Sequence, residues 1–129
     1  MSPKPRILVA EDDSSIRELI RARLQIAGYE ADVARTGAEA LERVSYQRFQ
    51  GMVLDINMPV LDGFGVLEML RTRAKTDAIP TLVLTARHAA DDVRRAIALG
   101  AKDYLTKPFT EGQLLARVAR LLRTAPVVV

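Results

Sequence analysis

Short apolar runs alternate with longer segments of helical period along the chain, and this alternation is the strongest constraint on the fold. Five such runs, rich in Val, Ile and Leu, occur at residues 7–10, 31–34, 52–54, 81–84 and 104–105. The first, third and fourth are almost free of polar residues, as is typical of strands buried on both faces of a parallel sheet. The helical segments supply the right-handed crossovers that parallel strands need. We therefore predict an α/β fold, with helices on both faces of a five-stranded parallel sheet.

The segments between the runs carry helix signals at both ends. Capping-box spacing occurs at three helix starts, as Ser15 with Glu18, Thr36 with Glu39, and Thr110 with Gln113. Gly28 and Gly100 lie where left-handed C-caps would end the first and fourth helices. Gly63 and Gly65 open the third helix and are interpreted as turn residues rather than a phosphate-binding loop.

Composition limits where the protein can be located and what it can bind. A chain of 129 residues, 49% hydrophobic, can bury one core without cross-links, and it contains no cysteine. Its apolar runs are too short to span a bilayer, and no signal-peptide pattern opens the chain. The net charge of +3 is scattered over predicted helices and aromatics make up only 5%. We predict a cytoplasmic domain that binds neither membrane nor nucleic acid directly.

Polar residues gather directly after the predicted strands. Glu11, Asp12 and Asp13 follow the first strand, Asp55 ends the third, Thr85 and Ala86 follow the fourth, and Thr106, Lys107 and Pro108 follow the fifth. In open parallel sheets the ligand site lies beyond the carboxyl ends of the strands. We therefore predict that these side chains converge at one edge of the sheet.

The chemistry of this cluster points to phosphoryl transfer. Carboxylates brought together repel, and Lys107 alone cannot balance them. A hard divalent cation can, and oxygen-only ligands suit Mg²⁺. An ionised Asp55 would then be a nucleophile that needs no general base, with Lys107 and the Thr85 hydroxyl facing the phosphoryl oxygens.

Four motifs in this order and spacing resemble the receiver domains of two-component response regulators, the CheY-like superfamily. They are Val9-Ala10-Glu11-Asp12-Asp13, Leu54-Asp55-Ile56-Asn57-Met58-Pro59 with Leu61-Asp62-Gly63, Leu84-Thr85-Ala86, and Lys107-Pro108-Phe109. The resemblance covers the chain from Ile7 to about Arg123. It implies a single flavodoxin-like (βα)₅ domain with strand order 2-1-3-4-5. That domain would occupy residues 1–129, with a core at about 5–124 and a C-terminal tail at 125–129.

The resemblance also implies a metal site and an acceptor. Asp55 matches the phospho-acceptor, and Asp12 matches the carboxylate that binds Mg²⁺ directly. Glu11 matches the neighbouring acid at the metal, and Asn57 would supply its backbone carbonyl. Asp13 is expected near the start of the first helix, outside the metal shell.

Phosphoryl binding and switching are implied for residues of the last two strands. Ala86 and Lys107 match phosphoryl-binding positions, and the Lys107–Pro108 peptide is expected to be cis. Thr85 and Tyr104 match the switch pair, in which the hydroxyl moves toward the phosphoryl group and the ring turns inward. The implied partner is a sensor histidine kinase or a histidine phosphotransfer protein, and the implied role is that of a signalling switch, not an enzyme.

One departure concerns self-association. Receivers of winged-helix transcription factors pair charges across a face built from the fourth helix, fifth strand and fifth helix. Val93 and Gln113 stand where part of that pairing is usually made, although Asp92, Arg117 and Arg123 retain some of it. We therefore expect a monomer or a weak, phosphorylation-dependent dimer.

Alternative interpretations remain open at this point. The acids could be a solvated loop or helix caps, Tyr104 a half-buried strand aromatic, and His88 a solvated loop residue. A pseudo-receiver that binds partners without phosphorylation has the same fold. A phosphohydrolase of the haloacid-dehalogenase type uses similar residues, but its nucleophile follows the first strand, whereas Asp55 follows the third.

Overall fold

The computed structural model describes residues 3–73, 79–86 and 88–123, and the predicted tail at 125–129 lies outside this part of the chain. Five parallel strands form one sheet in the order β2-β1-β3-β4-β5, as predicted. The strands are β1 (Arg6–Ala10), β2 (Glu30–Ala34), β3 (Gly51–Asp55), β4 (Thr81–Thr85) and β5 (Asp103–Thr106). The helices are α1 (Ser14–Ile26), α2 (Gly37–Tyr46), α3 (Gly63–Arg73), α4 (Ala90–Ala98) and α5 (Glu111–Arg123).

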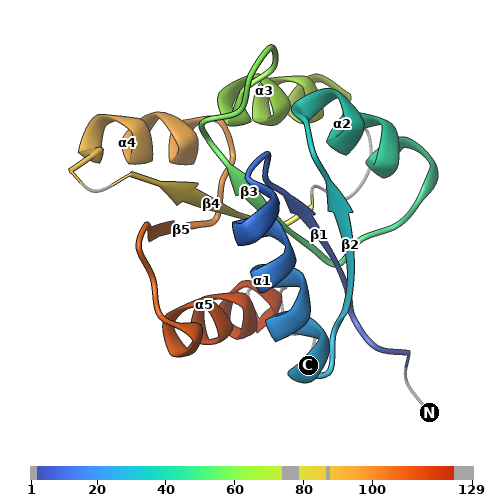
Figure 1. Cartoon of the computed structure of the whole chain (residues 1–129). Coiled ribbons are helices and arrows are strands. Elements are labelled where there is room, and N and C mark those ends of the chain that lie inside the picture. The colour runs from blue at the N-terminus through green and yellow to red at the C-terminus, as the bar shows by residue number, and fades with distance from the viewer. Residues whose placement is uncertain (1–2, 74–78, 87, 124–129) are drawn as a thin grey trace, which may run out of the picture.

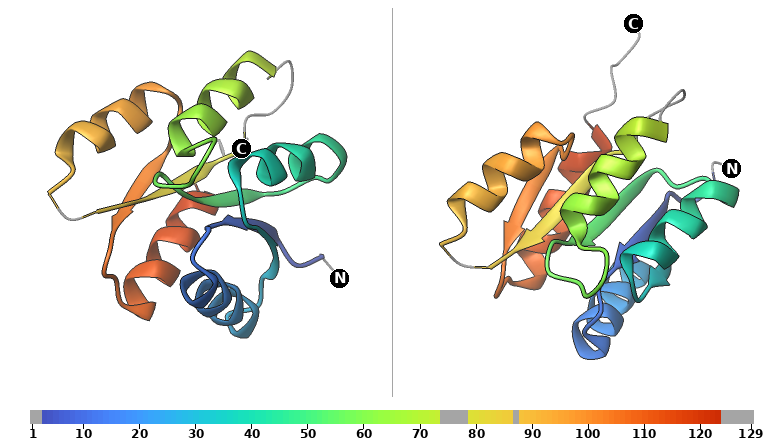
Figure 2. Two further views of the ribbon diagram at one scale, coloured as in Figure 1. Left: turned by 45° about the horizontal axis from the view of Figure 1, so that its top comes forward. Right: turned by 90° about the horizontal axis from the view of Figure 1, so that it is seen from above.

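Helices cover both faces of the sheet, with α1 and α5 on one side and α2, α3 and α4 on the other (Figures 1 and 2). Neighbouring residues of one strand therefore enter different cores. In β1, Leu8 packs into the core under α2, α3 and α4, while Ile7 and Val9 pack into the core under α1 and α5. All of β3 and β4 is buried. This two-sided burial is the physical reason for the nearly unbroken apolar runs.

The helix starts confirm two of the three predicted caps. Thr36 Oγ1 accepts the Glu39 N–H at 3.0 Å. Thr110 and Gln113 form a reciprocal capping box, with backbone N–H to side-chain oxygen distances of 2.9 and 3.1 Å.

The prediction of a Ser15–Glu18 capping box was wrong. The N-cap of α1 is Asp13, whose Oδ1 accepts the backbone N–H groups of Ser15 at 2.9 Å and Ile16 at 3.1 Å. A carboxylate at this position accepts hydrogen bonds from two backbone N–H groups that have no partner within the helix, and its negative charge interacts favourably with the positive end of the helix dipole. Glu18 instead pairs with Arg21 on the helix surface.

Both predicted left-handed C-caps are present. Gly28 has φ +101° after α1 and Gly100 has φ +113° after α4. Residues with a Cβ rarely adopt these φ angles, so glycine is the residue suited to end these helices. In the described part of the chain, no helix has the length and apolar character needed to cross a bilayer.

Candidate functional site

Three carboxylates meet at the carboxyl edge of the sheet, as predicted. Glu11 and Asp12 follow β1 directly and Asp55 is the last residue of β3, so the β1–β3 pairing brings them together. One carboxylate oxygen of each lies within 4.8 Å of those of the other two. Glu11 is fully buried and Asp55 is 3% exposed, whereas Asp12 faces solvent. The solvated-loop interpretation of this cluster does not fit the burial of Glu11 and Asp55.

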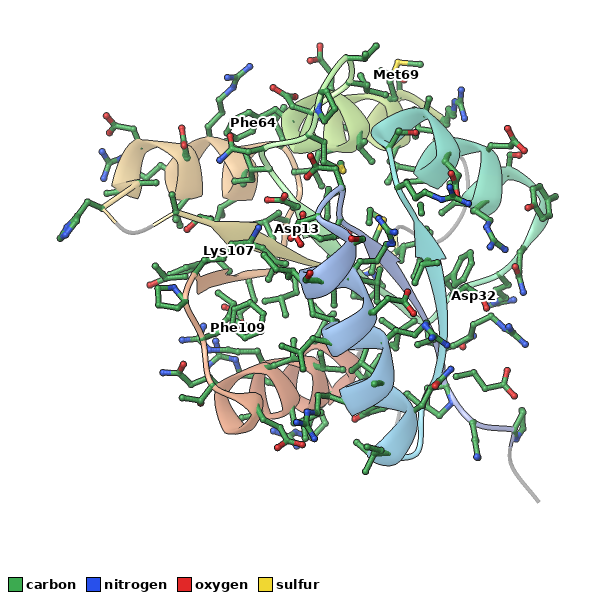
Figure 3. All side chains as sticks on the ribbon, in the orientation of Figure 1. Asp13, Asp32, Phe64, Met69, Lys107 and Phe109 are labelled. Atoms are coloured by element: carbon green, nitrogen blue, oxygen red, sulfur yellow. The ribbon has the colours of Figure 1, made fainter. Side chains whose placement is uncertain are left out.

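Lys107, which follows β5 and is labelled in Figure 3, contacts two acids of this cluster. Its Nζ lies 2.7 Å from Glu11 Oε1 and 3.3 Å from Asp55 Oδ2. Burial and the neighbouring Asp55 raise the pKa of the Glu11 carboxyl, and the contact with Lys107 only partly opposes this. Burial by itself would lower the pKa of Lys107, but the hydrogen bond to Glu11 and the charge of Asp55 outweigh it and raise that pKa.

The donor set fits a hard divalent cation. The three acids provide only oxygen ligands. Among the described residues Lys107 is the one ammonium in contact with them, so two negative charges stay uncompensated when all three acids are ionised. Lys107 already contacts Glu11 and Asp55. An added cation would therefore compensate the excess negative charge from the exposed side of the cluster, next to Asp12. Oxygen ligands with one side open to water suit Mg²⁺.

The loop after Asp55 is closed by hydrogen bonds from two backbone N–H groups. Asn57 N–H donates to Asp55 Oδ1 at 3.2 Å, and Gly63 N–H donates to the Ile56 carbonyl at 2.8 Å. A Cβ on Gly63 would lie 2.7 Å from the Asp55 carbonyl oxygen and 2.7 Å from Ile56 Cα. Glycine is therefore required for α3 to start this close to the end of β3.

Val60 lies at the tip of the same loop. It has φ +69°, an angle rarely adopted by β-branched residues, and its side chain is fully exposed. The Leu61 N–H donates to the Pro59 carbonyl at 2.8 Å, so Val60 is the central residue of a γ-turn.

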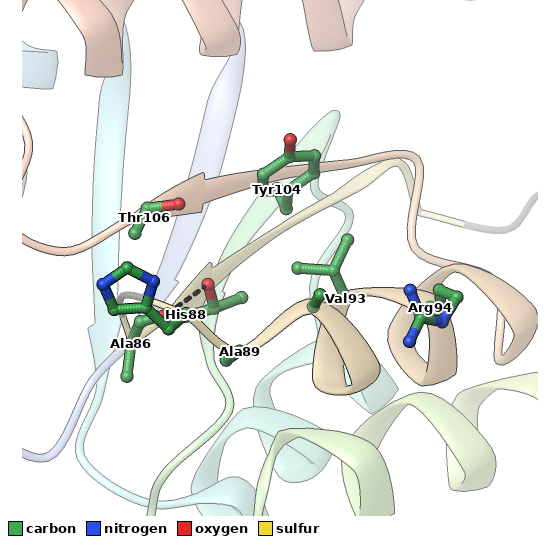
Figure 4. Close-up of a pocket in the computed structure, with 9 residues that line it drawn as sticks. Ala86, His88, Ala89, Val93, Arg94, Tyr104 and Thr106 are labelled. Carbon is green, nitrogen blue, oxygen red and sulfur yellow. Dashed lines mark hydrogen bonds between the residues drawn. The ribbon is translucent and has the colours of Figure 1, made fainter.

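An open pocket of about 340 Å³ lies beside the cluster, between β4, β5 and α4 (Figure 4). Thr85 and Ala86 line one part of it, and Thr85 Oγ1 donates to the Ala86 carbonyl at 3.2 Å. Tyr104 lines another part and is 38% exposed, which places its ring at the surface. His88 also lines the pocket, is exposed as predicted, and has φ +65°. The expected cis peptide between Lys107 and Pro108 is present.

Sequence reasoning missed two charged residues, Arg17 beside the acidic cluster and Asp103 at the start of β5. Arg17 Nη1 donates to the backbone carbonyls of Glu11 at 3.0 Å and Asp12 at 3.3 Å. Its position six residues after Glu11, in the first turns of α1, was an available signal. Asp103, 8% exposed, pairs with Arg117 at 2.8 Å and Arg120 at 2.5 Å. The acid stands at the start of an apolar strand and its two arginines lie 14 and 17 residues further along the chain, a spacing that gave no comparable signal.

The Asp103 cluster bears on the predicted association face. Arg117, one of the charges expected to remain available there, also donates to the Tyr104 carbonyl at 3.0 Å, and its guanidinium carbon lies 5.4 Å from the centre of the Tyr104 ring. In this structure Arg117 is therefore engaged within its own chain.

Comparison with known proteins identifies the family. Residues 7–119 match the model of the response regulator receiver domain. The chain is 45% identical over 119 residues to the transcriptional regulatory protein PrrA of Mycobacterium leprae, covering 92% of this chain and 50% of that protein. It is also 45% identical over 118 residues to the response regulator MprA of the same organism, covering 92% and 51%. The chain thus spans about half the length of these relatives.

Solved structures show the same architecture over nearly their whole length. The Vibrio cholerae chemotaxis protein CheY4 is 34% identical, with a TM-score of 0.87, and the match covers 93% of this chain and 100% of that one. The receiver domain of the Francisella response regulator 1452 is 33% identical, with a TM-score of 0.85 and coverage of 93% and 98%. Fold, motif order and the acidic cluster agree with these likenesses. The chain belongs to the family of response regulator receiver domains of two-component signalling.

Proposed function

We propose that this domain is a Mg²⁺-dependent phospho-acceptor switch that receives a phosphoryl group on Asp55. The observation that carries the proposal is the charge imbalance at the edge of the sheet. Glu11, Asp12 and Asp55 bring carboxylate oxygens within 4.8 Å of one another, while Lys107 provides the one ammonium in contact with the cluster among the described residues. Such an imbalance costs stability and persists where it serves a function.

The residues that would hold the metal are Glu11, Asp12, Asp55 and the backbone carbonyl of Asn57. Bound Mg²⁺ would neutralise the excess negative charge of the acids and of an incoming phosphoryl group. Asp12 is the exposed member and is the natural first contact from solvent, whereas buried Glu11 is held by Lys107.

Asp55 has the properties of an acceptor. Its Oδ1 accepts the Asn57 N–H and its Oδ2 faces Lys107, so the carboxylate is oriented from both sides. An Asp55 oxygen would attack phosphorus of a phosphohistidine as the P–N bond breaks. The imidazole nitrogen keeps the electron pair of that bond and later takes a proton from water. The product is an acyl phosphate, and no general base is needed.

Lys107, Thr85 and Ala86 would stabilise that product. The Lys107 ammonium lies 3.3 Å from Asp55 Oδ2 and is placed to contact phosphoryl oxygens. Thr85, the last residue of β4, would exchange its hydrogen bond to the Ala86 carbonyl for one to the phosphoryl group. The Ala86 backbone N–H is a second donor from the same strand end.

Signalling would follow from the pocket beside the site. Movement of Thr85 toward the phosphoryl group vacates space that the Tyr104 ring can enter, because both residues line this pocket. The equilibrium between outward and inward Tyr104 would then shift, changing the affinity of the face built from α4, β5 and α5 for another protein. The phosphodonor would be a sensor histidine kinase or a histidine phosphotransfer protein, in the cytoplasm, and the domain a monomer or weak phosphorylation-dependent dimer that contacts neither membrane nor nucleic acid itself.

Two other functions are less well supported. A pseudo-receiver would keep the fold without the chemistry, but such a domain has no need for three acids and a lysine in contact. A haloacid-dehalogenase-type phosphohydrolase is disfavoured because Asp55 ends β3 rather than β1.

Phosphorylation from a small donor tests the proposal. The wild type and the Asp55→Asn variant are incubated with acetyl phosphate and Mg²⁺, and intact masses are measured promptly at mildly acidic pH. We expect one phosphoryl adduct on the wild type, none on Asp55→Asn, and none after addition of EDTA. Asp62→Asn, which removes an exposed acid of the same loop, is the matched control and is expected to retain the adduct. An adduct on Asp55→Asn, or no adduct on the wild type at any Mg²⁺ concentration, would overturn the proposal.

A further inference from the structure

Arg17 connects helix α1 to the loop that carries two of the acids. Its Nη1 donates to the Glu11 carbonyl at 3.0 Å and to the Asp12 carbonyl at 3.3 Å. Arg17 is only partly exposed, and its own backbone N–H bonds the Asp13 carbonyl at 2.9 Å as part of the first turn of α1. One guanidinium nitrogen thus bridges two consecutive peptide groups from a rigid helix.

Those two peptide groups set the directions of the acidic side chains. A carbonyl fixed by a hydrogen bond restricts the backbone angles on either side of it, and the Cα–Cβ bonds follow the backbone. The loop is anchored on its other sides by the Glu11 N–H, which donates to the Ala34 carbonyl at 3.1 Å, and by Asp13, which caps α1. Between these anchors, the exposed Asp12 is the residue whose orientation depends most on Arg17.

We infer that Arg17 is a positioning residue for the metal site, which it supports by holding the Glu11–Asp12 backbone. The inference rests on the proposed function, since it requires that Glu11 and Asp12 bind Mg²⁺. Arg17 offers no ligand of its own, because a guanidinium has donors only. Its contribution would be preorganisation of ligands that bind through other atoms.

Preorganisation and simple electrostatics predict opposite results when Arg17 is removed. Arg17 is a cation next to a proposed cation site, so loss of its charge alone would strengthen Mg²⁺ binding. Loss of the two hydrogen bonds would instead free the Asp12 backbone and weaken binding. Removal of groups that orient metal ligands typically lowers affinity by about 10-fold or more, so we expect the weakening to prevail.

Calorimetric titration of Mg²⁺ into the full chain tests this inference. We expect the Kd of Arg17→Met to rise about 10-fold, and that of Arg17→Lys to rise less, because one ammonium can still bond a carbonyl. Arg21→Met is the control, since Arg21 lies one turn further along α1 and pairs with Glu18 on the surface. Its Kd is expected to stay at the wild-type value.

A second readout separates positioning from a general loss of structure. At saturating Mg²⁺, the rate of phosphorylation by acetyl phosphate is expected to return to near the wild-type value in Arg17→Met, because the defect lies in metal affinity. An unchanged or lower Kd in Arg17→Met would overturn the inference. If Arg17→Met does not fold, an unchanged Kd for Mg²⁺ in Arg17→Lys would overturn the inference instead. Absence of Mg²⁺ binding to the wild type would overturn the proposed function itself, and this inference with it.

Discussion

Removal of the Lys107 ammonium is expected to destabilise the fold when no metal is bound. Lys107 Nζ contacts Glu11 Oε1 at 2.7 Å and Asp55 Oδ2 at 3.3 Å, and both carboxylates are buried. In Lys107→Met the side chain keeps a similar length but loses its charge. Glu11 and Asp55 would then face each other in the interior without a cation.

The expected loss of stability follows from these distances. At an effective dielectric constant of about 20, the two contacts correspond to gross attractions of about 6 and 5 kcal/mol. Desolvation of all three groups offsets most of this, and breaking a buried ion pair costs about 3–5 kcal/mol in practice. The lower end applies here for two reasons. Lys107 remains 26% exposed, so water can reach the vacated position, and Glu11, whose pKa is already raised, can take up a proton. We therefore expect a loss of about 3 kcal/mol.

Urea unfolding followed by circular dichroism, in buffer containing EDTA, measures this loss. Glu11→Gln in the Lys107→Met background is expected to restore most of the lost stability, because it removes one of the two unpaired charges. Addition of Mg²⁺ is also expected to stabilise Lys107→Met more than the wild type. Lys102→Met, at an exposed lysine that precedes β5, is the control and is expected to change stability by less than about 0.5 kcal/mol. A loss below about 1 kcal/mol in Lys107→Met, or no recovery in the double variant, would show that Lys107 does not balance the buried carboxylates.

Three further predictions concern stability. The folded-state pKa of Glu11 is raised above its ordinary value of 4.5, so the metal-free wild type is expected to lose stability as pH rises from about 4.5 through the folded-state pKa. Glu11→Gln lacks this decline and is expected to be more stable than the wild type in EDTA at neutral pH, as urea titrations at several pH values would show. Val60→Gly removes a β-branched side chain from a positive φ and is expected to raise the free energy of unfolding by about 1 kcal/mol. An unchanged free energy of unfolding would contradict strain at this turn. Asp103→Ala leaves Arg117 and Arg120 without their shared, nearly buried carboxylate and is expected to lower the free energy of unfolding by about 2–3 kcal/mol. Asp91→Ala, at an exposed acid, is the control, and an equally small loss in both variants would contradict a structural role for Asp103.

The fold could be predicted from the sequence because its signals are local and repeat. Residues 7–10 and 81–84 are apolar throughout or nearly so, and this pattern reports burial on two faces directly. Thr36, Thr110 and the two C-cap glycines act on their own helices, so their spacing suffices to place the helix ends. Ser15 failed as a cap because α1 begins before it, at Ser14, with Asp13 as the N-cap that accepts the N–H groups of Ser15 and Ile16.

The residues that form the site could be predicted from the sequence, but the contacts between them could not. The rule that ligands gather at the carboxyl ends of parallel strands places Glu11, Asp55 and Lys107 together. It does not say that Lys107 contacts Glu11 more closely than Asp55, since that depends on side-chain packing. The position of Arg17 six residues after Glu11 indicates that it lies near this loop, but its bonds to two carbonyls could not be predicted, because backbone acceptors carry no sequence signature.

The most direct test of the central claim is to locate the phosphoryl group on the chain. After incubation with acetyl phosphate and Mg²⁺, borohydride reduction converts an aspartyl phosphate to homoserine, and peptide mass spectrometry then identifies the position. If Asp55 is the acceptor, homoserine is expected at position 55 alone, and none when EDTA is present during phosphorylation. Homoserine at position 12 or 62 with none at 55, or modification that is independent of Mg²⁺, would contradict that claim.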